Sequence, residues 1–471
     1  MSENKQSVCD EFGETHHSTG TMASFSFQNF INEFLNVAFG MFVFYFYEVE
    51  IGLNVILTSI GFVIYALWNA VNDPLVGYLT DRPFKFTRKW GRRFPWIIIG
   101  SVGWILAYIL IFTPPNVDPE SGAWIIFIWL VVTTCTSDTL ASVQSTNFLS
   151  LFPDKFRGQE RAKASGLMAI IGFIGIALGS IGPPLFIEYG NLQSYITQAG
   201  ILAVVGLVAV FASIKGVRDE PEMVERYLKK CEEIEYKESF FTTFKSALKQ
   251  KNYRIMLISY FLMQTTTACL LSSIIYVVRY ILEADPEVTM YLMVGFLLGA
   301  LGSSPFWSMI CKKVQNNYKM MIISSFLEVI FLIPLLIGST FIVILIGGTL
   351  FGISFGGYAV IFRGLVFPDV IDETVVIRGK RQEGVYIGIR DFFGRLSFLS
   401  QAIIFAAIHI LTGFDRGVEK QTQLAKWGIS IHFALVPMIC TLIVAFLFIA
   451  YYDLKPAKTK EIREKIMELK L

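Results

Sequence analysis

Acidic and amide side chains occur in this chain inside long apolar segments, where a charge is costly. Asn69 and Asp73 are four residues apart in one such segment, so an α-helix would place them on one face. A carboxylate at membrane depth costs about 2.5–3.5 kcal/mol on the insertion scale, which makes it a functional-site hypothesis. Carboxylate and amide oxygens suit a hard cation such as sodium, and a carboxylate can also hold a proton. The pair therefore predicts a cation-binding site. The alternative is that Asp73, followed by a proline, only shapes the end of its helix.

Further charged and polar residues interrupt two other apolar segments. Asp138 and Ser145 are seven residues apart, on one stripe of a helix, and Arg390 and Arg395 lie in a later segment. Guanidinium groups offer a rigid fork to carboxylates, phosphates or sugar hydroxyls. Each charge would be costly facing lipid, so we expect these residues to line an internal cavity that binds a polar substrate. Arg390 has the alternative of pairing with Asp391 or Asp138.

The composition requires a membrane around the elements that carry these residues. The chain has 471 residues, of which 54% are hydrophobic and only 17% charged, against about 25% charged in a soluble domain. A helix needs about 20 apolar residues to cross the bilayer. Twelve segments meet this requirement: 24–47, 53–79, 94–113, 124–152, 164–187, 195–215, 254–282, 289–311, 319–338, 341–366, 384–412 and 427–452.

Basic residues gather in alternate connections between these segments. The connection between the second and third segments holds Arg82, Arg92 and Arg93, and Glu48 stands in a connection of the other set. Basic connections face the cytoplasm, so both termini and the polar stretch 216–253 are predicted to be cytoplasmic. The glycine-rich stretches 166–182 and 347–357 are predicted to be seams where helices pack closely.

A short motif recurs at matching places in the two halves of the chain. Phe-Pro-Asp occurs at 152–154 and at 367–369, and an Arg-Gly and a Gln-Glu follow in both copies. We therefore expect an all-α, polytopic membrane protein of two pseudo-symmetric six-helix bundles. The predicted parts are a cytoplasmic tail (1–23), an N-terminal bundle (24–215), a cytoplasmic linker (216–253), a C-terminal bundle (254–452) and a cytoplasmic tail (453–471).

Several of these motifs together resemble a known family. They are the Asn-Asp-Pro of 72–74 followed by a basic loop, the Gly-Tyr-Leu-Thr-Asp-Arg of 77–82, both Phe-Pro-Asp motifs, and the Pro-Asp-Val-Ile-Asp of 368–372. The chain resembles the glycoside–pentoside–hexuronide:cation symporters of the major facilitator superfamily, whose best-known member is melibiose permease. The resemblance implies a secondary active transporter that couples sodium or proton entry to a polar organic solute, such as a sugar or glycoside, by alternating access.

The family's binding residues carry over unevenly. The resemblance implies that Glu33 serves both cation and substrate, that Asp73 belongs to the cation site, and that Arg395 replaces an essential lysine. Asn69 stands where the family has a further carboxylate of the cation site, and Ser145 where it has one that holds sugar. Each departure replaces a carboxylate by a neutral group, which weakens a sodium site and disfavours galactoside-type recognition.

Other positions also depart from the family pattern. Leu149 replaces a sugar-stacking tryptophan, and 166–172 contains no arginine where the family has one. Asp138 has no counterpart and is expected to be a substrate or proton group of this chain alone. Asp81 and Arg82, in the superfamily's gating motif, are expected to act with Arg92 and Arg93 as a gate; their ion pairs and helix-end contacts would hold the gate closed.

The sequence argues against enzymes and nucleic-acid-binding proteins. It has no nucleophile–base set, phosphate loop or metal signature, so we expect no cofactor and no metal beyond a transported sodium at Asp73. The four histidines all lie outside the predicted site. We expect a monomer in the lipid bilayer of the cell membrane. Two alternatives stay open: a transporter of lysolipids or other amphipathic solutes, and a membrane sensor or scaffold that transports nothing.

Overall fold

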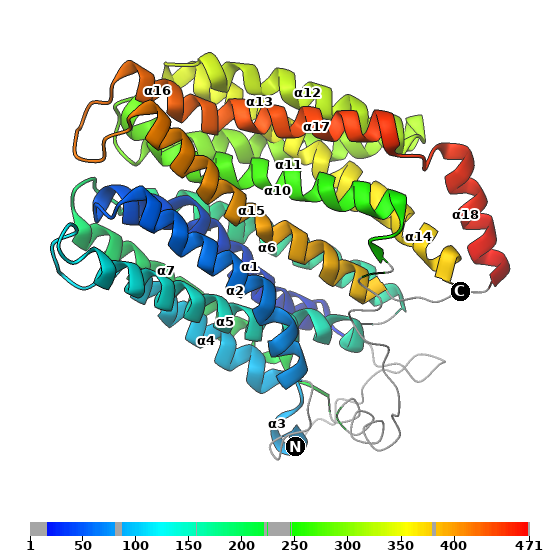
Figure 1. The fold of residues 1–471 in the computed structure, drawn as a ribbon. Coiled ribbons are helices and arrows are strands. Elements are labelled where there is room, and N and C mark those ends of the chain that lie inside the picture. Colours follow the sequence, from blue (N-terminus) through cyan, green and yellow to red (C-terminus); the bar gives the residue numbers. More distant parts are fainter. Residues whose placement is uncertain are drawn as a thin grey trace. The chain divides into compact units, whose positions relative to one another are not determined.

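The computed structural model describes residues 17–80, 87–156, 158–220, 224, 245, 247–378 and 383–469. Within these ranges the chain forms helices and no strands (Figure 1). Twelve helices in the described ranges are long and apolar enough to cross a membrane. A backbone in lipid must satisfy its own hydrogen bonds, which helices do within one segment. The predicted all-α fold with twelve spans is therefore confirmed.

The helices of the N-terminal half follow one another with short connections. They are α1 (Thr19–Tyr45), the π-helical η1 (Phe46–Glu50), α2 (Val55–Thr80), α3 (Thr87–Trp90), α4 (Phe94–Ile111), α5 (Ala123–Lys155), α6 (Gly158–Ile181), the 3₁₀ turn η2 (Pro183–Leu185) and α7 (Leu192–Val217).

The helices of the C-terminal half include three further π-helical segments. The elements are α10 (Lys251–Tyr276), η3 (Val277–Ile281, π), α11 (Val288–Val314), α12 (Asn317–Ile337), α13 (Phe341–Tyr358), η4 (Ala359–Val366, π), α14 (Phe367–Arg378), α15 (Glu383–Thr412), α16 (Gln423–Ser430), η5 (Ile431–Leu435, π), α17 (Val436–Tyr451) and α18 (Pro456–Leu469).

The tenth span is longer than the sequence predicted. We expected it to end at residue 366, before the second Phe-Pro-Asp motif, but α13, η4 and α14 run on as one span, Phe341–Arg378. The motif begins α14, where Pro368 is the second residue. A proline is tolerated in the first turn of a helix, so it does not have to end the span. The first copy of the motif lies in the last turn of α5.

Contacts between Cα atoms divide the chain into two compact units. The first unit consists of Met1–Phe39, Val71–Ile187 and Asn191–Glu235, and the second of Gly40–Ala70, Glu188–Gly190 and Tyr236–Leu471. Residues of α1 and α2 thus belong to both units. The predicted boundaries of two six-helix bundles, 24–215 and 254–452, stay a prediction.

Glycines bring helices into backbone contact inside each unit. In the first unit, a Cβ atom on Gly179 of α6 would lie 2.3 Å from the carbonyl oxygen of Phe34 in α1. In the second unit, a Cβ atom on Gly352 of α13 would lie 2.1 Å from the carbonyl oxygen of Phe296 in α11. No Cβ atom fits at such distances, so only glycine allows these helices to approach. The two predicted seams are therefore confirmed.

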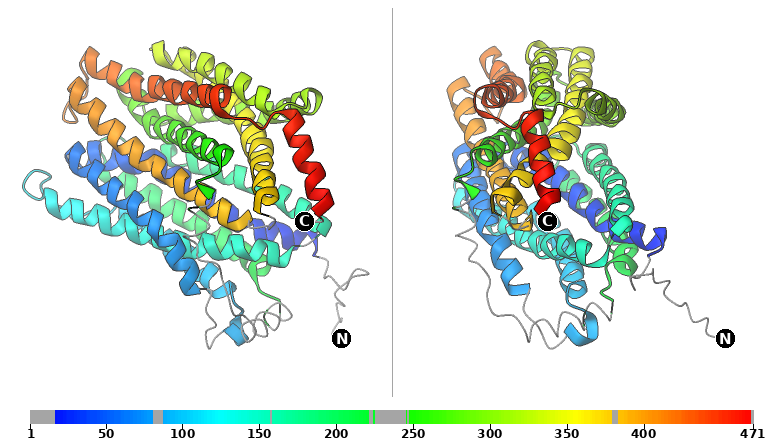
Figure 2. Two further views of the ribbon diagram at one scale, coloured as in Figure 1. Left: turned by 45° about the vertical axis from the view of Figure 1, so that its right-hand side comes forward. Right: turned by 90° about the vertical axis from the view of Figure 1, so that its right-hand side faces the viewer.

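The segments that flank the second unit are only partly described. Residues 221–223, 225–244 and 246 of the predicted linker lie outside the described residues. After the last span, α18 packs against α14 (Figure 2).

Candidate functional site

Two of the predicted acids are joined by hydrogen bonds in the first unit. The hydroxyl of Ser142 in α5 donates to Oδ1 of Asp73 in α2. The amide nitrogen of Asn72 lies 2.9 Å from Oγ of Ser142 and 3.1 Å from Oδ2 of Asp138. Asn72, Ser142 and Asp138 are buried, whereas Asp73 is half-buried. The structure thus brings Asp73 and Asp138 into one network between α2 and α5.

Ser142 and Asn72, which link the two carboxylates, are neutral groups. The Ser142 hydroxyl has one proton, which it gives to Asp73, so its oxygen accepts from Asn72. The second amide proton of Asn72 is available to Asp138. Two carboxylates linked by a hydroxyl and an amide can hold a monovalent cation or a proton, because the linking groups do not cancel their negative charge.

Asn72 and Ser142 are functional candidates that were missed in the sequence. We expected Ser145 to share a stripe with Asp138, but Ser142, one turn beyond Asp138, supplies the hydroxyl in this network. The spacing of four residues from Asp138 to Ser142 was the available signal. Nothing in the sequence indicated which stripe of α5 faces α2.

The second unit joins two other predicted site residues. Nη1 of Arg395, in α15, donates to Oδ1 of Asn69, in α2, over 2.6 Å. Asn69 is 7% exposed and Arg395 is half-buried, so the hydrogen bond is partly shielded from water. The guanidinium group of Arg395 therefore donates a hydrogen bond to the amide oxygen that we predicted to bind a cation. Its charge opposes a second cation at the same oxygen, so cation binding there requires Arg395 to move.

Arg390 pairs locally, as the alternative reading of the sequence held. Its Nε and Nη2 lie 2.9 and 2.7 Å from Oδ1 of Asp391. The guanidinium carbon also lies 4.5 Å from the ring centre of Phe367 and 5.2 Å from that of Tyr260. These contacts fix the plane of the guanidinium within the second unit.

Glu33 lies where α1 meets α6 in the first unit. A Cβ atom on Gly172 would be 3.5 Å from Cγ of Glu33 and 2.3 Å from Nδ2 of Asn29. Asn29 also donates to the carbonyl of Met168 over 3.0 Å. The stretch 166–172, which lacks the arginine of the resembled family, therefore provides the surface against which the α1 polar residues pack.

The predicted gate is described only in part. Asp81 and Arg82 lie outside the described residues, and Arg92 is half-buried just before α4. Arg93 is 5% exposed, and its Nη1 donates to Oδ1 of Asn147 in α5 over 3.0 Å. Arg93 thus ties the start of α4 to α5, and its gating role stays a prediction.

Asp219, just beyond α7, binds the start of α4. Its Oδ2 accepts the backbone N–H groups of Arg93 and Phe94, each over 2.9 Å, as an N-capping side chain would. Gly91 has φ +92°, and a Cβ atom on it would lie 2.2 Å from Oδ2 of Asp219. Burial raises the pKa of Asp219. The turn before α4 therefore requires glycine at position 91.

His17 forms a second contact at this end of the first unit. Its Nδ1 lies 2.9 Å from Glu160, at the start of α6, and its Nε2 lies 2.6 Å from Glu220, beyond α7. The hydrogen bond with Glu220, and then that with Glu160, raise the pKa of His17 against the opposing effect of burial. Lys155, whose Nζ donates to the carbonyl of Arg218, has a pKa lowered by burial.

Comparison with known proteins decides the family. A family model described as "MFS/sugar transport protein" matches residues 24–455. The chain belongs to this family. The relatives include the uncharacterized symporter YnaJ of Bacillus subtilis (strain 168), 23% identical over 434 residues and 88% of each chain. The sodium-dependent lysophosphatidylcholine symporter 1-B of Danio rerio is 22% identical over 426 residues, with 82% of this chain and 77% of the relative covered.

Solved structures agree with this assignment at the level of the fold. The D-xylose–proton symporter superposes with a TM-score of 0.64 at 12% identity, covering 94% of this chain and 98% of that one. A bacterial homologue of the human drug peptide transporters gives a TM-score of 0.59 at 13% identity, with 90% and 97% covered. The chain is thus a multi-pass membrane transporter with the major facilitator fold, and it is not an enzyme.

Proposed function

We propose that the chain couples the movement of sodium or a proton to the symport of a small polar organic solute. The carboxylates Asp73 and Asp138, joined through Ser142 and Asn72, carry this proposal, because they form a half-buried acidic site inside a membrane transporter. The protein would reside in the cell membrane as a monomer, with both termini in the cytoplasm.

The proposed mechanism follows from the charge of this site. A cation or proton at Asp73 neutralises part of a buried negative charge, which lowers the cost of excluding water when the transporter closes around its solute. If the solute favours the same occluded state, each ligand strengthens the binding of the other. Glu33 and Asn69 complete the proposed cation site, and Asn69 becomes available when Arg395 moves to the solute.

The proposed substrate residues are Glu33, Asp138, Ser145, Arg390 and Arg395. Their carboxylates, hydroxyl and guanidinium groups match the hydrogen-bonding groups of a sugar or glycoside. The family description, "MFS/sugar transport protein", supports this class of solute.

A lysolipid or another amphipathic solute is the second candidate. Two observations favour it: several relatives are named sodium-dependent lysophosphatidylcholine symporters, and Leu149 stands where the resembled sugar transporters have a stacking tryptophan. Leu149 is exposed on α5, 52% accessible, and so offers an apolar surface.

A counterflow assay in proteoliposomes tests these proposals. The purified protein is challenged with a panel of sugars, glycosides and lysophospholipids, under a sodium gradient and under a proton gradient separately. We expect one class of solute to exchange and one gradient to accelerate its uptake. Exchange without acceleration by either gradient would reject cation coupling, and no exchange of any solute would favour the sensor or scaffold.

A further inference from the structure

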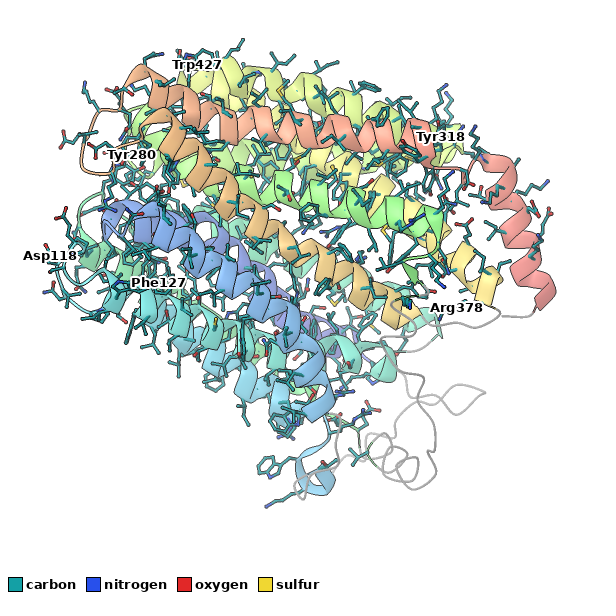
Figure 3. All side chains as sticks on the ribbon, in the orientation of Figure 1. Asp118, Phe127, Tyr280, Tyr318, Arg378 and Trp427 are labelled. Atoms are coloured by element: carbon teal, nitrogen blue, oxygen red, sulfur yellow. The ribbon has the colours of Figure 1, made fainter. Side chains whose placement is uncertain are left out.

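A group of buried titratable side chains lies at one end of the second unit. Glu48, His409 and His432 have exposed fractions of 2%, 2% and 0%. Figure 3 shows Tyr280 towards this end of the unit and Arg378 towards the other. Arg378 belongs to a basic connection that is expected to be cytoplasmic, so the buried group lies at the expected outer end.

These side chains form a continuous row of hydrogen bonds. Oε1 of Glu48, in η1, lies 2.7 Å from Nδ1 of His409, in α15. Nε2 of His409 lies 3.3 Å from Nε2 of His432, in η5. Nδ1 of His432 lies 2.7 Å from Oγ of Ser273, in α10, whose hydroxyl donates to the carbonyl of Cys269. The row therefore has three links between four side chains.

The number of protons in this row follows from the hydrogen bonds of Ser273, its last side chain. The single hydroxyl proton of Ser273 is used in the hydrogen bond to the Cys269 carbonyl, so the Ser273 oxygen must accept a hydrogen bond from an N–H at Nδ1 of His432. Each of the other two links also needs one proton. Three protons between one carboxyl group and two imidazoles give a net charge of zero, wherever the mobile proton resides.

Three arrangements satisfy that count. The extra proton lies on Oε1 of Glu48, on His409 as an imidazolium beside a carboxylate, or on His432 as an imidazolium with the carboxylate still ionised. Nδ1 of His432 carries a proton in all three. Passing the proton from one arrangement to the next breaks one N–H or O–H bond and forms another along an existing hydrogen bond, so the row can relay a proton.

The surroundings of the row favour the neutral state. The Tyr276 hydroxyl donates to Oε2 of Glu48, and the ring of Phe414 stacks on that of His409 with centres 4.3 Å apart. The nearby charge of Glu50 is already paired with Arg279 over 2.6 Å. The titratable or charged groups around the row are Tyr45, Glu50, Tyr276, Arg279, Tyr280 and Asp415.

We propose that Glu48, His409 and His432 form a proton-binding site that holds one exchangeable proton at the outer end of the second unit. Loss of that proton changes the charge of the site from zero to −1 and leaves two protons for three hydrogen bonds. Nδ1 of His432 keeps one of these protons, and the other serves either the Glu48–His409 link or the His409–His432 link, so the link without a proton has only lone pairs facing each other. A buried charge beside such a link is costly, so the elements that the link joins, η1 and α15 or α15 and η5, must separate or admit water.

Two features of the backbone agree with a site that changes shape. Glu48 lies in η1 and His432 in η5, and both segments are π-helical. Single π-helical turns inside α-helices occur frequently at functional sites. The proposed site shares no residue with the network of Asp73 and Asp138, so the proposal stands whether or not that network binds a cation.

Histidine-selective NMR of the full-length protein tests the proposal. The chain has only four histidines, so ¹⁵N labelling of their rings gives few signals, and single His→Gln variants assign them. We expect Nδ1 of His432 to carry a proton throughout a titration from about pH 5 to about pH 9. The ring nitrogens of His409 should shift as a single proton leaves the site.

The Glu48→Gln variant distinguishes a shared proton-binding site from two buried histidines that act independently. Glutamine can donate to Nδ1 of His409 without a mobile proton, so the pH-dependent shift of His409 should disappear. Glu283→Gln is the matched control, because Glu283 is an exposed acid paired with Lys426, and it should leave the titration unchanged. Ser273→Ala removes the hydrogen-bond acceptor of Nδ1 of His432, so the proton of His432 should no longer be confined to Nδ1.

Either of two results would overturn the proposal. One is a wild-type His432 without a proton on Nδ1, and the other is a His409 that titrates in Glu48→Gln as it does in the wild type. If Glu48→Gln does not fold, the wild-type protonation pattern still decides. The NMR measurement requires no transported solute, so its failure is distinct from a failure of the symport proposal.

Discussion

Replacing Asp73 with asparagine tests the proposed cation site with a minimal change of shape. The side chains have the same number of heavy atoms, and Oδ1 of asparagine can still accept the Ser142 hydroxyl. The substitution removes one negative charge and leaves Asp138 and Asn72 in place. We therefore expect the variant to insert and fold while it binds the coupling cation more weakly.

The size of the effect can be bounded from the site. Two unit charges about 4 Å apart attract by about 4 kcal/mol at an effective dielectric constant of about 20, which gives an upper limit. Hydrogen bonds to charged groups contribute about 1.5–3 kcal/mol net, and Asp73 is half-buried, so water screens part of its field. Since about 1.4 kcal/mol is a tenfold change, the cation concentration for half-maximal uptake should rise about 10- to 150-fold.

Solute counterflow in proteoliposomes, measured over a range of sodium concentrations and of pH, gives this number directly. Asp118→Asn is the matched control in the same unit, because Asp118 is exposed and its Oδ1 accepts from a local turn. Asparagine can accept the same bonds, so the control should behave as the wild type. Wild-type cation stimulation in Asp73→Asn, or an equal loss in the control, would refute the assignment.

Three further predictions concern other features. Glu220 and Glu160 raise the pKa of His17, so the charged ring contributes its full stabilisation below about pH 6.5. This stabilisation is lost as the pH rises through the raised pKa. His17→Gln should therefore weaken the pH dependence of the melting temperature across that window. Gly352→Ala should lower the melting temperature by forcing α13 from α11, whereas Gly348→Ala, with ordinary contact at 3.9 Å, should change it little. Gly91→Ala should destabilise by about 1–3 kcal/mol, measured by thermal unfolding in detergent.

The spans could be predicted because one property, apolar length, decides them. Eleven of the twelve spans could be located without knowing which helices they pack against. The end of the tenth span was predicted wrongly, because the π-helical η4 continues into the helix that contains Pro368. Backbone hydrogen bonding inside a membrane allows few alternatives to a continuous helix. A proline motif at the end of an apolar segment does not say on its own whether the helix stops.

The site residues could be predicted as types but not as pairs. Charge inside an apolar segment singled out Asp73, Asp138 and Arg395, whereas the partner of Arg395, Asn69, depends on how α15 meets α2. Glu48 looked like an ordinary loop acid because it stands at the end of a span. Packing between helices distant in sequence determines such pairs, and a single sequence contains no periodic pattern from which this packing can be predicted.

The π-helical η5 makes the junction between α16 and α17 tolerant of the loss of a residue. A π turn accommodates one residue more than the α-helical path it replaces. Deleting one residue from Ile431–Leu435, even an alanine, would let a regular helix form with α16 and α17 near their present alignment. The same deletion in a regular α-helical turn would rotate one flank by about 100° against the other, so the loss of a single codon would misalign the flanking surfaces less at η5 than elsewhere in these helices.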